Sequence, residues 1–273
     1  MKIFRLFALS GIIALAACSG NVSELIKKAE QGDADAQLEY ARLLKTSGNG
    51  VEQDWKKAVE MIQLSAEKGN HDAEWELGAL YEFANHMPQD SAKAIEWYRK
   101  SADAGSPIGL YMLAHCYQHG IAIEENHHIS DSLYAKSVEE LTKLASQEDM
   151  YVLNFLGSAY YWGDGVKEDR KKAFEYYLTS AKKGNPETQY KIGNCYETAQ
   201  GTEKDMEKAK EWYRKSADQG YQDALDALLA VCLHGLLTPG GEHLVGVMMM
   251  VVAGAVGIVT FLAVMVVMVM LVL

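Results

Sequence analysis

The sequence predicts an all-α protein, a right-handed α/α solenoid of about five to six helix-turn-helix repeats. Two observations predict this fold class. Alanine recurs in steps of 36, 43, 36 and 36 residues, at Ala66, Ala102, Ala145, Ala181 and Ala217, and a period of this length indicates a repeat architecture. Inside each period, apolar and small residues recur at the spacing of one helix face. Because one helical hairpin cannot bury its own apolar face, we expect the hairpins to stack and share a core.

Each repeat is predicted to contain two helices joined by a turn. In the second repeat, the core residues of the first helix stand at i, i+4, i+7 and i+8, at Ala73, Leu77, Leu80 and Tyr81. The turns that begin at Gly48 and Gly163 are rich in glycine, which tolerates the left-handed backbone that ends a helix. An aspartate precedes the second helix and fits an N-cap. These aspartates are Asp54, Asp90, Asp169 and Asp205.

The repeats organise most of the chain. Residues 19–32 are expected to form a lead-in helix, and residues 33–235 to form the solenoid. Its complete repeats are expected at 33–71, 72–107, 108–149, 150–186 and 187–221, and a sixth begins at Gln222 and stops after its first helix. The 43-residue step places a seven-residue insertion in the third repeat, after Tyr117. The turn of the second repeat, from Asn85 to Pro88, lacks the glycines.

A family resemblance follows from the residues that recur in phase. The pattern Ala-Gln-x-x-x-Gly-x-x-Tyr, then Gly-x-Gly-Val-x-x-Asp-x-x-Lys-Ala, then Trp-Tyr-x-Lys-Ser-Ala-x-x-Gly resembles the Sel-one-like repeat, a relative of the tetratricopeptide repeat, over roughly residues 34–233. Some secreted members have a cysteine pair in each repeat, and this chain does not. Their disulfides and activities therefore do not carry over. Cys116 and Cys195 share one register and are expected to lie in the core.

The first 18 residues are predicted to be a targeting segment. Lys2 and Arg5 precede an apolar run, and Leu15-Ala16-Ala17-Cys18 ends it, as in a cleaved signal peptide. This ending resembles the lipobox of bacterial lipoproteins, which implies a lipid on Cys18 and anchoring in the cell envelope. Ser19 after it implies sorting to the outer membrane, with the protein on the periplasmic face. The alternative is an ordinary signal peptide that happens to contain a cysteine.

The C-terminal segment has two interpretations. Residues 236–243 are expected to be a linker, and residues 244–273 contain no charged side chain. Thirty residues of helix are about 45 Å long, enough to cross a hydrocarbon core of about 30 Å. The segment is therefore either a transmembrane helix or, because it interrupts a repeat and is dominated by valine and methionine, an aberrant tail.

Composition disfavours some classes of partner. The formal net charge is −11, which disfavours a nucleic-acid or anionic-lipid surface, since either would need clustered lysine and arginine. No nucleophile motif, phosphate loop or nucleotide fingerprint is present. We therefore expect no enzyme activity and no cofactor.

Histidines near the insertion form a candidate metal site. His115 and His119 are four residues apart and share one helix face, and Glu124, Glu125, His127 and His128 follow. Imidazoles and carboxylates are zinc ligands. The competing interpretation is a solvated loop that binds no metal, and that is the one we adopt.

The helix face opposite the core is the predicted binding site. In helix-pair solenoids, the first helices line the concave groove, so the residues of this face should meet a partner. They are Trp75, Glu82, Tyr111, His115, Tyr161, Tyr190 and Asn194. Aromatic side chains among them are typical interface anchors. In the competing interpretation, these aromatic residues pack between neighbouring repeats.

The predicted function is a cell-envelope scaffold that binds a protein or peptide in this groove. One alternative within this class is an immunity protein that neutralises a toxin in the periplasm, which rests on resemblance. A second is an envelope hydrolase, which would need a catalytic pair that the sequence does not show. A third is a structural assembly factor for an envelope complex.

Overall fold

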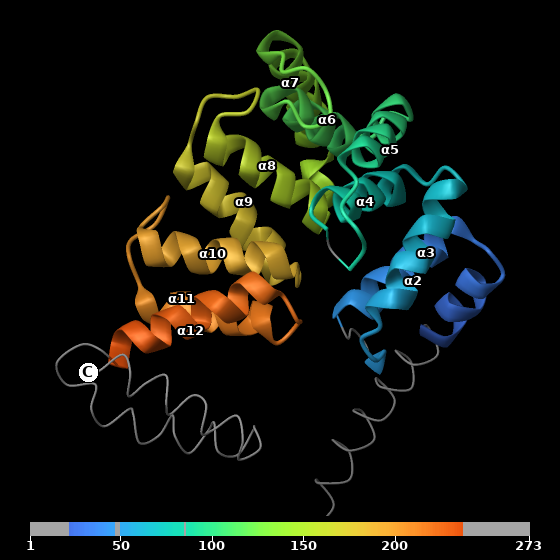
Figure 1. Ribbon diagram of the computed structural model, residues 1–273. Coiled ribbons are helices and arrows are strands. Elements are labelled where there is room, and N and C mark those ends of the chain that lie inside the picture. Colours follow the sequence, from blue (N-terminus) through green and yellow to red (C-terminus); the bar gives the residue numbers. More distant parts are fainter. Residues whose placement is uncertain (1–21, 47–49, 85, 237–273) are drawn as a thin grey trace, which may run out of the picture. The chain divides into compact units, whose positions relative to one another are not determined.

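The chain is built from antiparallel pairs of α-helices, and the computed structural model describes residues 22–46, 50–84 and 86–236. The predicted all-α solenoid is confirmed (Figure 1). The first helices of the five complete repeats are α2 (Ala34–Thr46), α4 (His71–Glu82), α6 (Pro107–His119), α8 (Met150–Trp162) and α10 (Pro186–Thr198). The second helices are α3 (Trp55–Glu67), α5 (Ser91–Asp103), α7 (His127–Leu144), α9 (Arg170–Lys182) and α11 (Met206–Ala217).

Several predicted features lie outside the described residues. These are the targeting segment with Cys18, the start of the lead-in helix, the start of the first turn at Gly48, position 85 of the second turn, and the C-terminal segment from residue 237 onward. Residues 22–30 are helical, within the expected lead-in helix. Among the residues that are described, none of the helices combines the length and apolar character of a membrane span.

The predicted aspartate caps are confirmed. In each case one side-chain oxygen of the aspartate accepts a hydrogen bond from the backbone N–H three residues later. Asp54 accepts from Lys57 at 2.9 Å and Asp205 accepts from Lys208 at 3.0 Å; Asp90 and Asp169 bond in the same way. These bonds satisfy donors that the first turn of a helix leaves without a partner. They also lower the pKa of Asp90 and of Asp205.

Two recurring contacts hold the two helices of a repeat together. A buried serine of the second helix donates its hydroxyl to a carbonyl at the start of the first helix. The pairs are Ser65 with Ala34, Ser101 with His71, Ser137 with Pro107, Ser180 with Met150 and Ser216 with Pro186, at 2.6–2.7 Å. In addition, the rings of Tyr98, Tyr177 and Tyr213 lie directly against Gly78, Gly157 and Gly193. A side chain larger than hydrogen would separate the two helices there.

The insertion of the third repeat lengthens a helix. The sequence suggested a solvated loop that includes His127 and His128, but these residues begin α7, with Asn126 as the N-cap. Helix α7 has 18 residues, whereas α3, α5 and α9 have 13. The segment from His127 to Leu144 contains neither glycine nor proline, so nothing in it ends the helix early.

The turns between first and second helices share a left-handed backbone geometry. In the second to fifth repeats, positive φ values occur at two positions of the turn, two residues apart, as at Gly163 and Gly165. In the second repeat, the same positions hold Ala84 at 53° and His86 at 61°. The His86 ring stacks on Trp55 with 3.9 Å between ring centroids. This stack helps to hold a conformation that glycine would adopt without strain.

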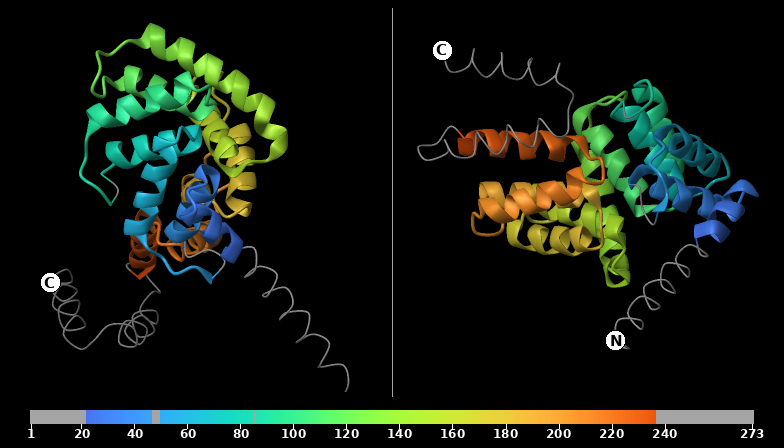
Figure 2. Two further views of the ribbon diagram at one scale, coloured as in Figure 1. Left: turned by 90° about the vertical axis from the view of Figure 1, so that its right-hand side faces the viewer. Right: turned by 90° about the horizontal axis from the view of Figure 1, so that it is seen from below.

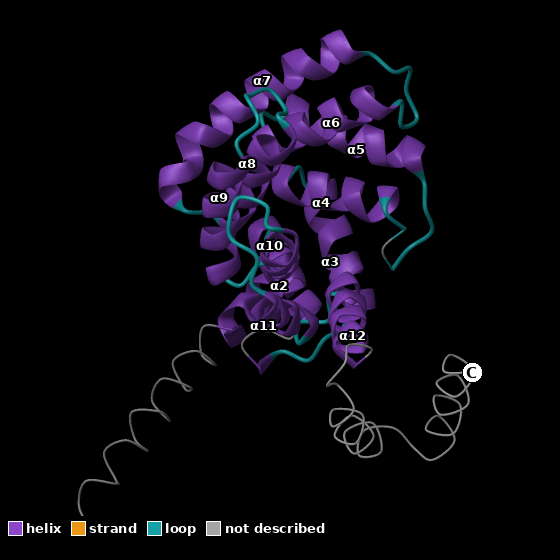
Figure 3. Cartoon of the chain, turned by 90° about the vertical axis from the view of Figure 1, so that its left-hand side faces the viewer, coloured by secondary structure: helices purple, strands orange, loops and turns teal. Residues whose placement is uncertain are grey.

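The helix pairs follow one another in space as they do in sequence. Figure 2 shows neighbouring colours lying side by side from α2 to α11, and Figure 3 shows only helices and loops in the described residues. The chain divides into two compact units, and Tyr221 is the last residue of the first. Helix α12 (Gln222–Leu236) belongs to the second unit, so the predicted repeat region of residues 33–235 crosses the boundary between them.

Candidate partner-binding surface

The aromatic residues of the first helices form a packed cluster. Trp75 makes edge contacts with Tyr151 and Phe155, with ring centroids 5.7 and 5.6 Å apart, and Phe155 also contacts Tyr111 at 5.3 Å. The second and third repeats thereby contact the fourth. Trp75 is 7% exposed and Tyr111 is 5% exposed. These two rings were expected to face a partner, but the structure covers them with residues of α8.

An ionic cluster lies beside the aromatic one. The buried carboxylate of Glu76 accepts hydrogen bonds from Arg42 Nε at 2.8 Å and from Lys45 Nζ at 2.6 Å. Burial disfavours the charged form of this carboxylate, but Lys45 and Arg42 outweigh burial and lower the pKa of Glu76. The Arg42 guanidinium also lies over the Tyr151 ring, 4.3 Å from its centroid. Residues of the first, second and fourth repeats therefore meet at one place.

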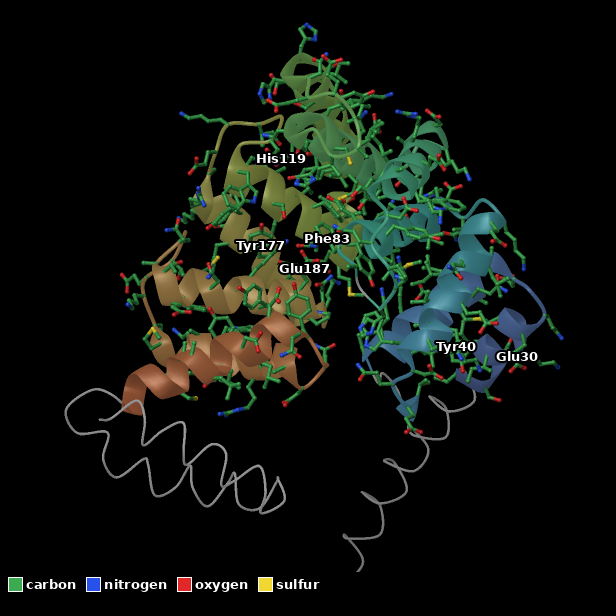
Figure 4. All side chains as sticks on the ribbon, viewed as in Figure 1. Glu30, Tyr40, Phe83, His119, Tyr177 and Glu187 are labelled. Carbon is green, nitrogen blue, oxygen red and sulfur yellow. The ribbon has the colours of Figure 1, made fainter. Side chains whose placement is uncertain are left out.

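A second polar cluster links the fourth and fifth repeats. Lys191 donates to Asn154 at 2.8 Å, to Ser158 at 3.2 Å and to Glu187 at 2.7 Å. Asn154 also donates to Glu187 at 3.2 Å. Desolvation opposes ionisation of Glu187, but Lys191 and Asn154 outweigh it and lower the pKa of this carboxyl. Figure 4 labels Glu187 and, on the neighbouring α9, Tyr177.

Glu82, His115 and His119 lie close together on α4 and α6. The Tyr98 hydroxyl donates to Glu82 at 2.6 Å, and His115 Nδ1 lies 3.6 Å from the other oxygen of Glu82. The rings of His115 and His119 have centroids 4.5 Å apart. His127 and His128 do not complete a site with them, because no group of three or more potential metal ligands is assembled within the described residues.

The remaining predicted residues lie in the fourth and fifth repeats. Tyr161 is half-buried beneath the guanidinium of Arg170, whose carbon is 3.8 Å from the ring centroid. Tyr190 is half-buried, and its ring lies 5.7 Å from that of Tyr213 and 5.6 Å from that of Tyr221. Asn194 is also half-buried. These three residues do not join the cluster around Trp75.

Comparison with known proteins identifies the repeat. The model of the Sel1 repeat matches residues 34–70, 71–106, 107–137, 151–185 and 186–221, which is well over half of the chain. This chain is a Sel1 repeat protein. The matched segments begin within one residue of a first helix in every repeat, so each Sel1 repeat corresponds to one helical pair.

Individual proteins are similar to this chain at low sequence identity. An uncharacterized protein of Neisseria meningitidis serogroup B is 25% identical over 166 residues, which are 61% of this chain and 33% of that protein. The chain therefore spans about a third of the length of this relative. A Sel1 repeat protein from Oxalobacter formigenes is 28% identical, with a TM-score of 0.45 and coverage of 86% of this chain and 92% of that one. An immunity protein from Pseudomonas aeruginosa is 24% identical, with a TM-score of 0.42 and coverage of 70% and 67%.

Sequence reasoning missed Arg42 and Tyr151 in this Sel1 repeat protein. Neither residue belongs to the register that predicted Trp75 and Tyr111, and their contact joins repeats that are not neighbours. The buried cysteines were predicted correctly, since Cys116 and Cys195 are free thiols within the core. Burial, followed by the nearby Glu82 carboxylate, raises the pKa of Cys116 to about 12. Burial likewise raises that of Cys195 to about 11.

Proposed function

We propose that this Sel1 repeat protein is a scaffold of the bacterial cell envelope, anchored on the periplasmic face by a lipid on Cys18. It binds a segment of a partner protein on the face formed by its first helices. Such a role needs no catalytic group and no cofactor. The outer membrane is the expected location, and residues 244–273 are a second candidate anchor.

The observation that carries this proposal is the accessibility of first-helix side chains in the fourth and fifth repeats. Tyr161, Tyr190 and Asn194 are half-buried and keep part of their surface open to solvent, whereas Trp75 and Tyr111 are buried. Aromatic side chains are preferred anchors in protein interfaces. We therefore expect the partner segment to lie along α8 and α10.

Site-specific crosslinking tests the proposed face. A photoreactive phenylalanine analogue is placed at Tyr161 or Tyr190, and envelopes are irradiated before purification. As a matched control, the analogue replaces Glu96, an exposed residue of the second helix α5. We expect one protein to be captured from Tyr161 and Tyr190 and not from Glu96. Capture of the same protein at equal yield from all three positions would contradict the proposed face.

The anchor and the narrower roles have separate tests. Mass measurement of the mature N-terminus is expected to show a lipid-modified cysteine at position 18, and the Cys18→Ser variant to leave the membrane fraction. An unmodified, uncleaved Met1 would exclude the lipid. If the captured protein is a toxin and the chain protects cells from it, the scaffold is an immunity protein. Capture at fixed stoichiometry within an envelope complex would favour an assembly factor.

A further inference from the structure

Three exposed apolar side chains stand beside the turns of neighbouring repeats. Among the described residues, five large apolar side chains are exposed: Phe83, Ile129, Trp162, Leu225 and Leu229. Phe83 is the C-cap of α4, Trp162 is the last residue of α8, and Ile129 stands in the first turn of α7. These three lie beside the turns of the second, third and fourth repeats. We call this surface, with His119, the turn edge.

The three residues at the ends of the first helices share one register. Phe83, His119 and Trp162 are separated by steps of 36 and 43 residues, the steps of the repeat itself. Figure 4 labels Phe83 and His119 on neighbouring repeats. Phe83 is 61% exposed and Trp162 is 67% exposed, whereas Trp75 and Tyr111 are buried. Among the described residues, the large aromatic side chains that are exposed are therefore Phe83 and Trp162, both at the turn edge.

The turn edge already holds a cation in the fourth repeat. The guanidinium carbon of Arg170 lies 3.8 Å from the ring centroid of Tyr161 and 5.7 Å from that of Trp162. Glu168 accepts a hydrogen bond from Arg170 Nε at 2.6 Å. The Tyr161 ring makes an edge contact with Trp162 at 4.8 Å. The ring of Tyr161 is thus occupied by Arg170, while most of the Trp162 ring remains accessible.

A glutamate accompanies the aromatic residue in two successive repeats. A Cβ atom built on Gly163, next to Trp162, would lie 3.7 Å from Glu168 Cβ. The same construction on Gly120, next to His119, gives 3.6 Å to Glu125 Cβ. The carboxylate of Glu125 lies 2.9 Å from His127. Each of these repeats therefore places a glutamate near the end of its first helix, and the carboxylate already contacts a basic side chain, Arg170 or His127.

We infer that the turn edge of the second to fourth repeats binds a protein segment that carries arginine or lysine between apolar side chains. Charge supports a basic partner, since the chain has a formal net charge of −11 and opposite charge steers association. Tryptophan is also one of the residue types most enriched at the centres of interfaces. Trp162 adjoins Tyr161 of the first-helix face, but the peptide test below depends only on Trp162 and Phe83, so it can fail or succeed independently of the proposed function.

Binding of a defined peptide to the full-length protein in detergent tests this inference. The probe is a fluorescein-labelled peptide of alternating arginine and leucine, and fluorescence anisotropy gives its Kd. We expect Trp162→Ala to weaken binding about fivefold to tenfold, which corresponds to the loss of one cation–π contact. Phe83→Ala is expected to weaken it about threefold. A glutamate–leucine peptide is expected not to bind.

A matched tryptophan controls for general effects. Trp97 on α5 lies beneath Lys100, whose Nζ is 3.8 Å from the ring centroid, and its replacement leaves the net charge unchanged. We expect Trp97→Ala to change the Kd by less than about twofold. Equal losses for Trp97→Ala and Trp162→Ala, or an unchanged Kd for Trp162→Ala, would overturn the inference. Circular dichroism of each variant confirms that it is folded, and Trp162→Gln replaces Trp162→Ala if it is not.

Lipid contact is the competing explanation for an exposed tryptophan. The protein is reconstituted into zwitterionic vesicles that contain brominated lipid, and its tryptophan emission is measured. We expect the quenching to be the same in the wild-type protein and in Trp162→Ala. Quenching that disappears in Trp162→Ala, together with no peptide binding, would assign the turn edge to the membrane and overturn the inference.

Discussion

The guanidinium of Arg42 lies over the ring of Tyr151, 4.3 Å from its centroid, and this contact joins the first repeat to the fourth. In a solenoid, each repeat is expected to contact mainly its neighbours. Here Trp75 extends the same contact from the second repeat. The first helices therefore stabilise one another over several repeats, and the face that was expected to be open is partly filled by the protein itself.

Removal of Arg42 tests how much this contact stabilises the fold. Arg42→Ala leaves the buried Glu76 with Lys45 as its remaining cation. We expect the free energy of unfolding to fall by about 2 kcal/mol, the usual scale for hydrogen bonds to a charged group. Arg42→Lys keeps the charge but loses the planar group that stacks on Tyr151, so an intermediate loss is expected. Urea unfolding at pH 7 measures both, and equal stability of all three proteins would contradict the prediction.

The same carboxylate makes stability depend on pH. Because Lys45 and Arg42 hold the pKa of Glu76 below its ordinary value, the ionised form stabilises the folded state above the pKa of the unfolded chain. This contribution is lost as the pH falls through the lower, folded-state pKa. Glu76→Gln is expected to be less stable than wild type at pH 7, and the difference to narrow as the pH falls below about 4. If the difference in the free energy of unfolding between the two proteins stays constant from pH 7 to pH 3, the ionisation of Glu76 does not contribute to stability.

The contact between Gly157 and Tyr177 leaves no space for a methyl group. A Cβ atom at Gly157 would lie 2.4 and 2.5 Å from two ring carbons of Tyr177. We expect Gly157→Ala to destabilise the protein by about 1–3 kcal/mol, despite the better helix propensity of alanine. In the third repeat, Ala114 occupies the same register, so Ala114→Gly is the matched control. This substitution introduces no clash. We expect it to lower the free energy of unfolding by about 1 kcal/mol, because glycine is the poorer helix former, and thermal or urea unfolding measures both variants.

The left-handed turn positions offer a stabilising substitution. Ala199 ends α10 with a φ of 59°, so Ala199→Gly removes a steric cost of about 1–2 kcal/mol and is expected to raise the melting temperature. His86 has a similar φ, but its ring stacks on Trp55. His86→Gly is therefore expected to gain less than Ala199→Gly, because the stack is lost. A larger gain from His86→Gly would show that the stack does not stabilise the turn.

The serine of each second helix is predicted to contribute measurably. The hydroxyl of Ser180 is buried and donates to the Met150 carbonyl at 2.6 Å, so Ser180→Ala is expected to lower the free energy of unfolding by about 1 kcal/mol. The neighbouring Thr179 bonds to a carbonyl of its own helix on the exposed side. Thr179→Ala is the control and is expected to change stability by less than about 0.5 kcal/mol. Equal effects would contradict a specific role for the serine.

Local features of the fold were predictable because they depend on neighbouring residues. Asp54 and Asp205 were recognisable as caps since the acceptor and its donor are three residues apart in sequence. The burial of Cys116 followed from its register on one helix. The same spacing located every helical pair, including the third, where the insertion had to be inferred from a single longer step.

Features that depend on the path of the solenoid were not predictable. Whether Trp75 faces a partner or Tyr151 depends on how much each repeat is rotated relative to the one before it. These small rotations add up along the solenoid, and the spacing of apolar residues within a helix does not predict them. The helical start at His127 was missed for a different reason, since the residues of the insertion were assigned to a solvated loop. Trp162 was missed because the predicted binding residues were restricted to the helix face opposite the core. Trp162 is the last residue of α8, and residues at helix ends were not considered.

The packing of Trp75 against Tyr151 and Phe155 also has a consequence for how the chain reaches its native state. These residues are about 80 positions apart in sequence. A contact between such distant positions forms only after a large loop has closed, and closing that loop costs conformational entropy. The repeats from Ala34 to Trp162 are therefore expected to refold more slowly than a row of independent hairpins, and to pass through an intermediate in which single pairs are formed but have not docked.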